Sequence, residues 1–475
     1  MMKQIAAQAI ASALLLSLLS ACGSSGTTEV QTTADTASQT TEAVTEAGPA
    51  FPAVSYGGED IHFLTEEYGI YTSIEIFSPG LDGSLINDTV YNRNLIIEER
   101  FDVRITEERL QNAHTTAYTT VLSGEDVYDV VMPYLNNSVS NAVEGFYLDL
   151  YEVENLHLEN SWWDQRANEN LRVGGKLYFT TGDISILDNE CTMVLLFNKQ
   201  MAEQNDLPDP YAMVREGKWT MDALFEMCSD LSVDLNGDGK MKNTDDQYGI
   251  YCAFNMPHSL YFGTGERIAV ADESGELQLV MYNERSAEVV NKIFDLCLGS
   301  DVMYGDGRDT AFKEGRLLMS SHAQSDIDAF RNCQFDFGIL PYPKYNEEQK
   351  EYYSFVSTIL TPGVSIPVTN NEPEKAGLIL EAMAYYSVDT LTHAYYDITL
   401  NDRYIRDEDS GEMLDIIFST RVYDFGFIFD VGGLGTLIET LYNTRRNNFA
   451  SLYEKRESKA KAALSDLMDS FGDAQ

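Results

Sequence analysis

The stretch that decides the fold is Gly174–Gln200, GGKLYFTTGDISILDNECTMVLLFNKQ. A Gly-Gly turn leads through an apolar run to the polar turn Thr181-Gly182-Asp183, and Val194–Phe197 follows as a short apolar run. Both runs, the first from Leu177, are expected to be buried strands, because a short apolar run is typical of a strand that is covered on both faces of a sheet. Because open α/β sheets bind ligands at turns of this kind, we expect the chain to cross here between two lobes, with this turn facing the cleft. A buried connector without a ligand fits the same pattern.

The first part of the folded chain alternates strands with a helix. Strands are predicted at Asp60–Thr65 and Tyr128–Met132, and a helix is predicted over Ile86–Phe101. This alternation indicates parallel βαβ units and therefore an α/β fold. Since loops at the carboxyl ends of parallel strands line the ligand crevice, Thr65–Tyr68 and Pro133–Asn137 become candidate binding segments.

Later segments carry clear strand and helix patterns. Strands are predicted at Leu317–Met319 and Phe335–Leu340, and helices are predicted from Pro373 and over Phe449–Phe471. The segment around Tyr261-Phe262-Gly263 is expected to be a loop with exposed aromatic side chains.

Two tryptophans stand side by side, Trp162 and Trp163, followed by Asp164. An indole face stacks on the C–H face of a sugar, and a neighbouring carboxylate can accept hydrogen bonds from the sugar hydroxyls. Either tryptophan is therefore a candidate ligand contact. One core residue beside one surface residue is the alternative.

A calcium-loop pattern follows a helix for which Thr220 is the expected N-cap. Oxygen ligands recur at the first, third, fifth and twelfth positions, Gly239 holds the sixth, and a backbone carbonyl is expected at the seventh. The predicted ligands of a structural Ca²⁺ ion are Asp234, Asn236, Asp238, Lys240 and Asp245. The twelfth position is Asp where Glu is usual, and an ion-free turn rich in Asp and Asn is the alternative.

The N-terminus predicts export and lipid attachment. Residues 1–22 combine Lys3, an apolar run and the ending Leu-Ser-Ala-Cys, which is the pattern of a lipoprotein signal peptide cleaved before Cys22. Residues 23–50 are rich in Ser, Thr, Ala and Glu and are expected to form a disordered tether that reaches about 30 Å. The lipid on Cys22 would be the only membrane anchor.

Composition excludes several partners. The chain carries 32 Lys and Arg against 76 Asp and Glu, a formal net charge of −44. Nucleic acid and anionic lipid would repel such a chain, so neither is expected to be its main partner. The five cysteines beyond Cys22 are widely spaced and odd in number, which argues against a disulfide framework or a zinc site and leaves one bridge possible.

Several motifs, in one order along the chain, together resemble the family 1 extracellular solute-binding lipoproteins, the sugar-binding components of bacterial carbohydrate ABC importers. Each motif is weak alone, and together they span nearly the whole mature chain. They are the lipobox, Asp149-Leu150, Trp162-Trp163, Gly175–Tyr178, Phe197–Lys199, Gly217–Thr220, the loop that ends in Gln247–Gly249, Phe312 with Gly315-Arg316, and Leu340–Lys344.

The resemblance implies an α/β, two-lobed periplasmic-binding-protein-like fold of type II, with a hinge between the lobes. Lobe 1 would hold residues 51–180 with a return segment at 352–390. Lobe 2 would hold residues 181–351 with C-terminal helices at 391–475.

By family position the resemblance also implies pocket residues, which come from the ends of strands, the crossing and an aromatic loop. They are Glu66, Glu67, Tyr134, Asn136, Asp183, Tyr261 and Phe262. In the segment after the Gly-Arg motif the family often has a Trp for sugar stacking, whereas this chain has His322 and Gln324.

The protein is expected to capture a carbohydrate, in particular an oligosaccharide. It would deliver this ligand to ABC permease subunits by lobe closure. The protein would act as a monomer at the extracellular face of the bacterial cytoplasmic membrane and would not be an enzyme, since no nucleophile elbow, HExxH, P-loop or dinucleotide motif occurs. A glycoside-acting enzyme with two carboxylates, and a sensing or adhesion lipoprotein on the same fold, are the alternatives.

Overall fold

The computed structural model describes residues 49–68, 71–72, 75–252, 255–272, 275–397 and 407–473. The chain divides into two compact units, Met1–Ala50 and Phe51–Gln475, and the second is described below. The expected signal peptide, Cys22 and the tether up to residue 48 lie outside the described residues. Among the described residues, no helix combines the length and the hydropathy of a membrane-crossing segment.

Lobe 1 is built around a small sheet. β1 (Glu59–Tyr68) runs parallel to β3 (Val103–Leu110) and to β4 (Val130–Met132), and β2 (Tyr71–Thr72) pairs antiparallel with β1. Returning chain extends this sheet through bridges from Val131 to Ser365 and from Thr180 to Val364. The helices of lobe 1 are α1 (Leu85–Phe101), α2 (Ala113–Ser123), α3 (Leu135–Val143), η1 (Leu150–Glu152), α4 (Gln165–Asn170), α12 (Pro373–Ser387), η3 (Val388–Thr392) and α13 (His393–Asp397).

Lobe 2 is built around a five-stranded sheet of order β11-β5-β10-β6-β9. All six residues of its strand β5 are buried, as the apolar run predicts. The strands are β5 (Met193–Asn198), β6 (Tyr248–Tyr251), β9 (Val302–Met303), β10 (Leu317–Ala323) and β11 (Phe337–Leu340). The helices are α6 (Lys199–Gln204), α7 (Pro210–Arg215), α8 (Met221–Cys228), α9 (Met256–Gly263), α10 (Glu284–Cys297), α11 (Arg308–Lys313), η2 (Gln324–Phe330) and α14 (Glu408–Ser419).

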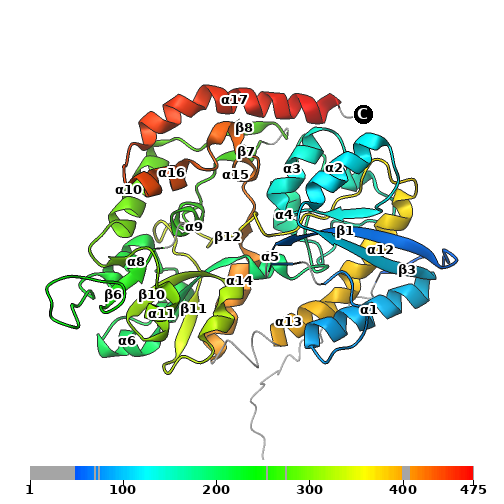
Figure 1. The fold of residues 1–475 in the computed structure, drawn as a ribbon. Helices are drawn as coiled ribbons and strands as arrows, with labels where there is room; N and C mark the ends of the chain where they lie inside the picture. Colours follow the sequence, from blue (N-terminus) through cyan, green and yellow to red (C-terminus); the bar gives the residue numbers. More distant parts are fainter. Residues whose placement is uncertain are drawn as a thin grey trace, which may run out of the picture. The chain divides into compact units, whose positions relative to one another are not determined.

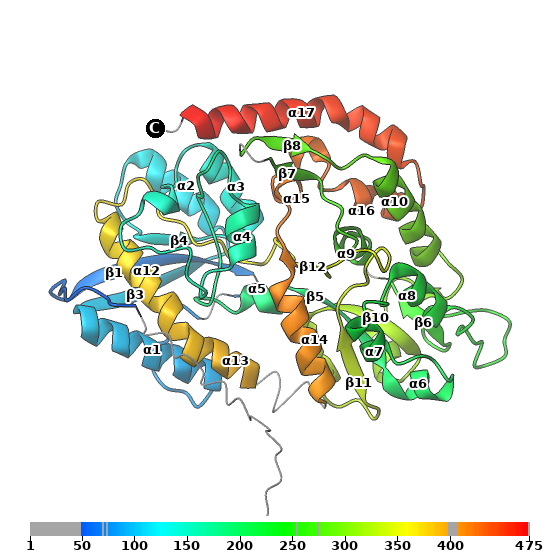
Figure 2. The same cartoon turned by 180° about the vertical axis from the view of Figure 1, so that it is seen from behind.

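A further group of elements lies on the side of lobe 2 nearest α3. They are the hairpin β7 (Ala269–Ala271) and β8 (Leu277–Leu279), then α15 (Phe425–Ile428), η5 (Val431–Gly433), α16 (Leu437–Thr444) and the long helix α17 (Phe449–Asp473). α17 runs along one edge of the unit, from the α10 and α16 side to the α2 and α3 side (Figures 1 and 2).

The two lobes are joined by crossing segments. The chain leaves lobe 1 after Thr181 and reaches β5 through α5 (Leu187–Glu190), and it returns through β12 (Ser354–Phe355). β12 pairs in parallel with β13 (Arg421–Val422). α13 packs against α1 and belongs with lobe 1, although the sequence places it past the lobe boundary at residue 390. The connection from α13 to α14 lies outside the described residues.

Most expected elements are confirmed, including the strands at β1, β4, β5, β10 and β11 and the helices α1, α12 and α17. Thr220 caps α8 by accepting a hydrogen bond from the Ala223 backbone N–H. Two expectations are wrong. The aromatic segment at Tyr261 is the buried helix α9 rather than an exposed loop, and the run from Leu177 makes a single bridge at Thr180 rather than a strand. The five cysteines of the described residues are buried thiols.

Candidate functional site

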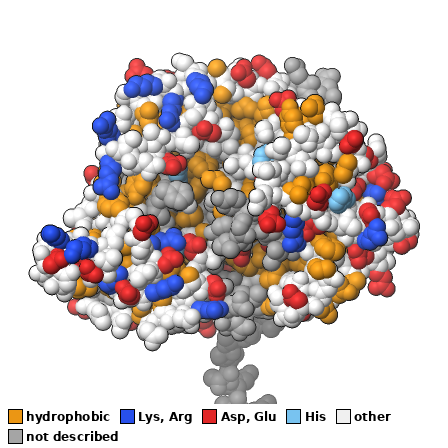
Figure 3. Space-filling view, in the orientation of Figure 1, with side chains coloured by type: hydrophobic (Ala, Val, Ile, Leu, Met, Phe, Trp, Pro, Cys, Tyr) orange, Lys and Arg blue, Asp and Glu red, His pale blue; other side chains and the backbone are white. Residues whose placement is uncertain are grey.

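A cavity of about 360 Å³ lies where the two lobes meet. One wall is α3 of lobe 1, another is the chain that leaves β12, and the third is formed by α9, α15 and α16. In the space-filling view, hydrophobic side chains are visible below α17 near the middle of this face (Figure 3). The lining residues are Asn136, Val139, Ser140, Asn255, His258, Thr358, Ile359, Phe427, Ile428, Phe429, Asp430, Gly435, Thr436 and Glu439.

The wall from lobe 1 is held by a buried carboxylate. Glu66 lies two residues before the end of β1 and is 2% exposed. Its carboxylate accepts hydrogen bonds from the Tyr134 backbone N–H at 3.0 Å and from the Asn137 amide at 3.1 Å. His114 Nδ1 lies 2.9 Å from the same carboxylate. These bonds fix the start of α3, and Asn136 and Ser140 then lie on one exposed face of the helix because they are four residues apart. The candidate segments after β1 and β4 therefore do meet.

The wall from lobe 2 is aromatic. The His258 ring lies edge-on to Phe427 at 5.2 Å between centroids and parallel to Phe355 at 6.1 Å. Its Nε2–H donates to the Gly435 carbonyl at 3.2 Å. Burial lowers the pKa of His258 to about 4, so the ring is neutral at pH 7. Phe429 stacks on Phe425 with centroids 3.9 Å apart, which fixes the ring at the other side of this wall.

Two carboxylates complete the lobe 2 wall. Asp430 adopts a left-handed conformation with φ 41°, and its Oδ1 accepts a hydrogen bond from the Thr436 backbone N–H at 3.3 Å. Glu439, in the first turn of α16, accepts a hydrogen bond from the Asn443 amide at 3.3 Å. Within the part of the chain that the structure describes, no Lys or Arg lines the cavity.

The wall formed by the chain that leaves β12 carries a buried polar group with no hydrogen-bond partner among the described residues. Thr358 is 1% exposed, and its hydroxyl makes no hydrogen bond within the described part of the chain. Its neighbour Ile359 is 53% exposed and lines the same cavity. A buried hydroxyl without a partner costs about 1–3 kcal/mol, so a ligand or water that reached it would recover stability.

A cluster of charged side chains joins the segments that cross between the two lobes. Arg421 of β13 contacts Asp164 and Asp188, each at 2.9 Å. Tyr423 donates to the same Asp164 carboxylate at 2.9 Å, and Arg421 donates to the Asn189 side chain at 2.7 Å. The cluster thus connects α4 of lobe 1, the crossing helix α5 and β13. Two acidic partners and an amide oxygen hold the two terminal nitrogens of the Arg421 guanidinium, while its Nε–H makes no hydrogen bond among the described residues. These contacts fix the relative placement of the three segments.

The tryptophan pair lies within lobe 1 and not among the cavity residues. Trp163 is 1% exposed and donates from its indole N–H to Glu381 at 2.8 Å. Trp162 is half-buried, edge-on to Tyr385 at 5.2 Å. A Cβ on Gly182 would lie 2.4 Å from the Trp162 carbonyl, so only glycine allows the crossing to pass this close to the pair.

Other sequence-predicted residues also lie outside the cavity. Tyr261 and Phe262 are fully buried in α9, where Phe262 stacks on Phe355 at 5.2 Å. Glu67 is half-buried at the pairing of β1 with β2. At the crossing, Asp183 accepts a hydrogen bond from Thr392 at 2.9 Å, and burial raises its pKa to about 6. Ligand contact by these residues stays a prediction.

Three predicted residues are buried polar groups near the crossings. His322 is fully buried on β10, its Nε2 lies 2.7 Å from the Ser320 hydroxyl, and burial lowers its pKa to about 4. The Gln324 amide and the Thr181 hydroxyl form no hydrogen bond among the described residues. Such groups are candidates for ordered water or a ligand, so their role also stays a prediction.

Of the predicted ligand contacts, Asn136 is the one that lines the cavity. Sequence reasoning missed the segment after β13, which supplies Phe427, Phe429 and Asp430. A signal was present there, because two aromatic residues and an Asp precede the glycine pair Gly432-Gly433. A glycine pair after such a run marks a sharp turn.

In the loop predicted to bind calcium, the carboxylates contact other groups of the same loop. Asp234 accepts hydrogen bonds from the Gly237 and Gly239 backbone N–H groups at 2.7 Å, and Asp238 pairs with the Lys242 ammonium. In the described ranges, no group of three or more His, Cys, Asp or Glu side chains is placed to hold a metal ion. The ligand types suit a hard cation, but Asp238 would have to leave Lys242 to serve as a ligand.

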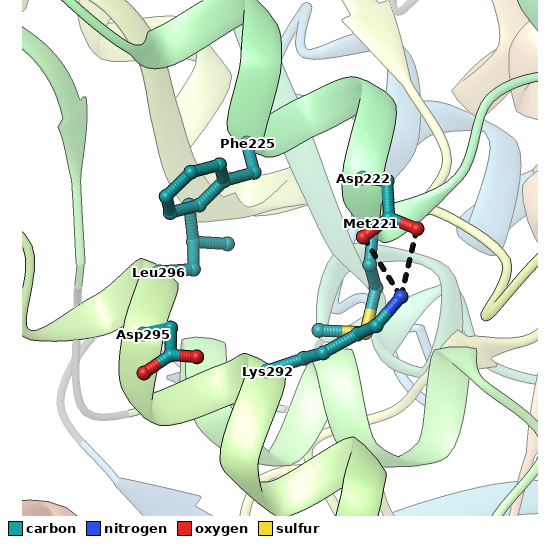
Figure 4. Close-up of a pocket in the computed structure, with 6 residues that line it drawn as sticks. All are labelled: Met221, Asp222, Phe225, Lys292, Asp295 and Leu296. Carbon is teal, nitrogen blue, oxygen red and sulfur yellow. Dashed lines mark hydrogen bonds and ion pairs between the residues drawn. The ribbon is translucent and has the colours of Figure 1, made fainter.

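A second pocket, of about 240 Å³, lies on lobe 2 between α8 and α10 (Figure 4). Phe225 faces Leu296 across it, and the Lys292 ammonium contacts both oxygens of Asp222 at 2.7 Å. All of its lining residues come from these two helices, so lobe 1 contributes none. It lacks the two-lobed construction of the cavity above.

Comparisons with known proteins establish the fold. No protein-family profile matches the chain, and no curated protein matches it in sequence. Among solved structures, a cyclo/maltodextrin-binding protein in complex with maltotetraose is similar with a TM-score of 0.54 and 13% identity, over 87% of this chain and 97% of that one. Apo RafE from Streptococcus pneumoniae is similar with a TM-score of 0.51 and 16% identity, over 90% of this chain and 100% of that one.

UgpB from Mycobacterium tuberculosis, in complex with glycerophosphocholine, is similar with a TM-score of 0.53 and 15% identity, over 86% of this chain and 99% of that one. At these identities the likeness shows the fold alone. The chain therefore has the α/β, two-lobed fold of periplasmic-binding-protein-like substrate-binding proteins, as the sequence predicts.

Proposed function

We propose that the protein is a family 1 solute-binding protein, which captures a carbohydrate in the cavity between its lobes and delivers it to ABC permease subunits. The observation that carries this proposal is the three-walled construction of the cavity. A solute that touches α3 and α16 together stabilises the closed arrangement, because it binds that arrangement better than the open one.

The chemistry of the lining supports a polyhydroxylated solute. The rings of Phe427 and Phe429 offer apolar faces for sugar C–H groups, and the polar side chains of Asn136, Ser140 and Glu439 offer hydrogen-bond partners for hydroxyls. The volume falls near the lower end of the ~300–1,000 Å³ range of ligand pockets. A short saccharide, or one part of a longer one, suits this space.

One of the solved proteins of similar fold is named for cyclo/maltodextrin and is bound to maltotetraose, and another is bound to glycerophosphocholine. These ligands are bound by those proteins and do not establish what this chain binds. The solute class of this chain is therefore a proposal. The alternative of a glycoside-acting enzyme rests on Asp430 and Glu439, since two carboxylates in one cavity are what glycoside hydrolysis uses. Hydrolysis of a bound oligosaccharide would establish that alternative.

The cellular setting is part of the same proposal. Lipidation of Cys22 would hold a monomer at the extracellular face of the bacterial cytoplasmic membrane, and residues 23–50 would let it turn toward the permease subunits. Replacement Cys22→Ser should release the protein from the membrane fraction to the medium. Retention of the variant on membranes would contradict lipid anchoring.

The test of solute capture is titration calorimetry of the full-length protein against neutral and amine-bearing oligosaccharides. Binding of at least one series, with about tenfold weaker binding in Asn136→Ala, is expected, because this side chain lies on the cavity wall of α3. Asn332→Ala, an exposed asparagine before β11, is the matched control. Equal weakening by both variants, or no binding by either series, would contradict the assignment.

A further inference from the structure

Among the described residues that line the cavity, all side chains with a formal charge are acidic. They are Asp430 and Glu439, and no Lys or Arg of the described residues stands beside them in the lining. His258, the one other titratable group of the wall, is neutral at pH 7 because burial lowers its pKa. The protein as a whole carries a net charge of −44, which adds to the negative potential in this cavity rather than offsetting it.

Neither carboxylate is paired with a cationic side chain of the described residues. Within the described residues, neither Asp430 nor Glu439 forms an ion pair, and each accepts one hydrogen bond at 3.3 Å from a neutral group. Arg456 of α17 approaches this segment, but its guanidinium donates to the Gly433 carbonyl and lies 3.5 Å from the Thr440 hydroxyl, and neither residue lines the cavity. The cavity therefore contains two carboxylates with unused acceptor capacity.

The same cavity offers other groups that suit a cation. Phe427 and Phe429 line the cavity. An ammonium group is attracted to the face of an aromatic ring, and the carboxylates beside these rings add to that attraction. Thr358 adds a hydroxyl that is 1% exposed and makes no hydrogen bond within the described part of the chain. This orphan hydroxyl is independent of the acidic pair, and it indicates a missing polar partner at the cavity.

We propose that the solute captured in this cavity carries a positive charge, as an amine-bearing saccharide does, and that its ammonium group lies against Asp430 and Glu439. This inference rests on the proposed function and specifies its ligand class. An anionic solute would meet two carboxylates without a compensating cation. A neutral saccharide could use the same acceptors, but it would not gain the attraction between unlike charges that an ammonium group gains at the exposed Asp430 and the half-buried Glu439.

The experiment compares two matched ligand series, glucosamine oligosaccharides and the same oligosaccharides N-acetylated, by titration calorimetry of the full-length protein. N-acetylation removes the charge and keeps the length and linkage. Binding of the amine series should be at least about tenfold tighter and should weaken as the salt concentration rises, because the attraction is between charges.

Asp430→Asn should abolish most of that preference, and so should Glu439→Gln. The matched control is Asp206→Asn, since Asp206 is an exposed aspartate that, like Asp430, has a left-handed backbone, here with φ 51°. Asn tolerates this conformation, so both replacements should leave the fold intact.

Equal or tighter binding of the N-acetylated series, with no change of preference in Asp430→Asn, would overturn the inference and leave saccharide capture standing. Absence of binding by both series would overturn the inference together with the proposed function. The inference would also be overturned if Asp206→Asn reduced the amine preference as much as Asp430→Asn does. The negative charge would then act from outside the cavity.

Discussion

At the scale of single residues, Glu66 is the group on which the lobe 1 wall depends. Its buried carboxylate accepts hydrogen bonds from the Tyr134 backbone and the Asn137 amide, and His114 lies beside it. Glu66→Ala should lower the free energy of unfolding by about 3 kcal/mol, because hydrogen bonds to a charged group are lost and their donors stay buried. Urea unfolding measures this.

The matched control is Glu67→Ala, since Glu67 is the half-buried neighbour on the same strand. Its effect should stay below about 1 kcal/mol. An equal loss of stability in both variants would contradict the role given to Glu66.

Glu190, at the end of the crossing helix α5, makes stability depend on pH. Burial raises its pKa from 4.5 to about 7, so the folded state holds this proton more tightly than the unfolded state. The contribution of Glu190 to stability is therefore fully present below about pH 4.5 and is lost as the pH rises through about 7. Glu190→Gln should stabilise the protein at about pH 8 by about 1–3 kcal/mol and change little near pH 4.

The control for this prediction is Glu203→Gln, an exposed glutamate on α6. Unfolding free energies of both variants, measured across the pH range, provide the comparison. A stabilisation by Glu190→Gln that is the same at acid and alkaline pH would contradict the assigned titration.

At the scale of elements, strands and helices follow from the sequence wherever one short-range signal decides them. The fully buried strand β5 follows from its apolar run, and α8 begins where Thr220 provides a cap. The run after Gly174 failed to become a strand because only Thr180 pairs with the returning chain. That pairing depends on Val364, which is far away in the sequence, so local pattern could not predict it.

The side chains that form the site were harder to predict than the elements. A buried aromatic and a ligand-facing aromatic have the same local pattern, so Phe262 and Phe427 could not be distinguished from sequence. In the structure Phe262 is fully buried, whereas Phe427 is half-buried at the cavity. The segments that hold Glu66 and Asn136 were predicted because they lie toward the carboxyl ends of parallel strands in one sheet, and ligand contact by either residue stays a prediction.

The loop Asp234–Asp245 carries the prediction of structural calcium, which we maintain as a proposal. Chelation by EGTA should lower the melting temperature if the folded loop binds the ion, because a ligand that binds only the folded state stabilises it. Asp234→Asn with Asp238→Asn should remove this response. A melting temperature that is indifferent to chelator and to added calcium would contradict the proposal.

At the scale of the whole unit, α17 connects the two lobes away from the crossings. Its start packs with lobe 2, where Tyr453 stacks on Tyr282 at 4.9 Å, and its end contacts lobe 1, where Phe471 stacks on Tyr178 at 4.9 Å. The Lys176 ammonium lies 3.4 Å from the Phe471 carbonyl. The helix α17 therefore spans both lobes along the top of the unit in Figures 1 and 2.

Phe471→Ala should lower the free energy of unfolding by about 3 kcal/mol, because this ring is 3% exposed and packs between Tyr178 and Phe429. Leu122→Ala is the control, since Leu122 is 66% exposed and its replacement should cost less than about 0.5 kcal/mol. Equal effects of the two variants would show that the end of α17 is not docked on lobe 1 in solution.

The measurement that tests the central claim most directly is a crystal structure of the protein with the tightest-binding saccharide of the two series. The account predicts ligand density in the cavity, in contact with Asn136 of lobe 1 and with Asp430 or Glu439 of lobe 2. Density confined to another place, such as the α8–α10 pocket in Figure 4, with the cavity filled only by water, would contradict it.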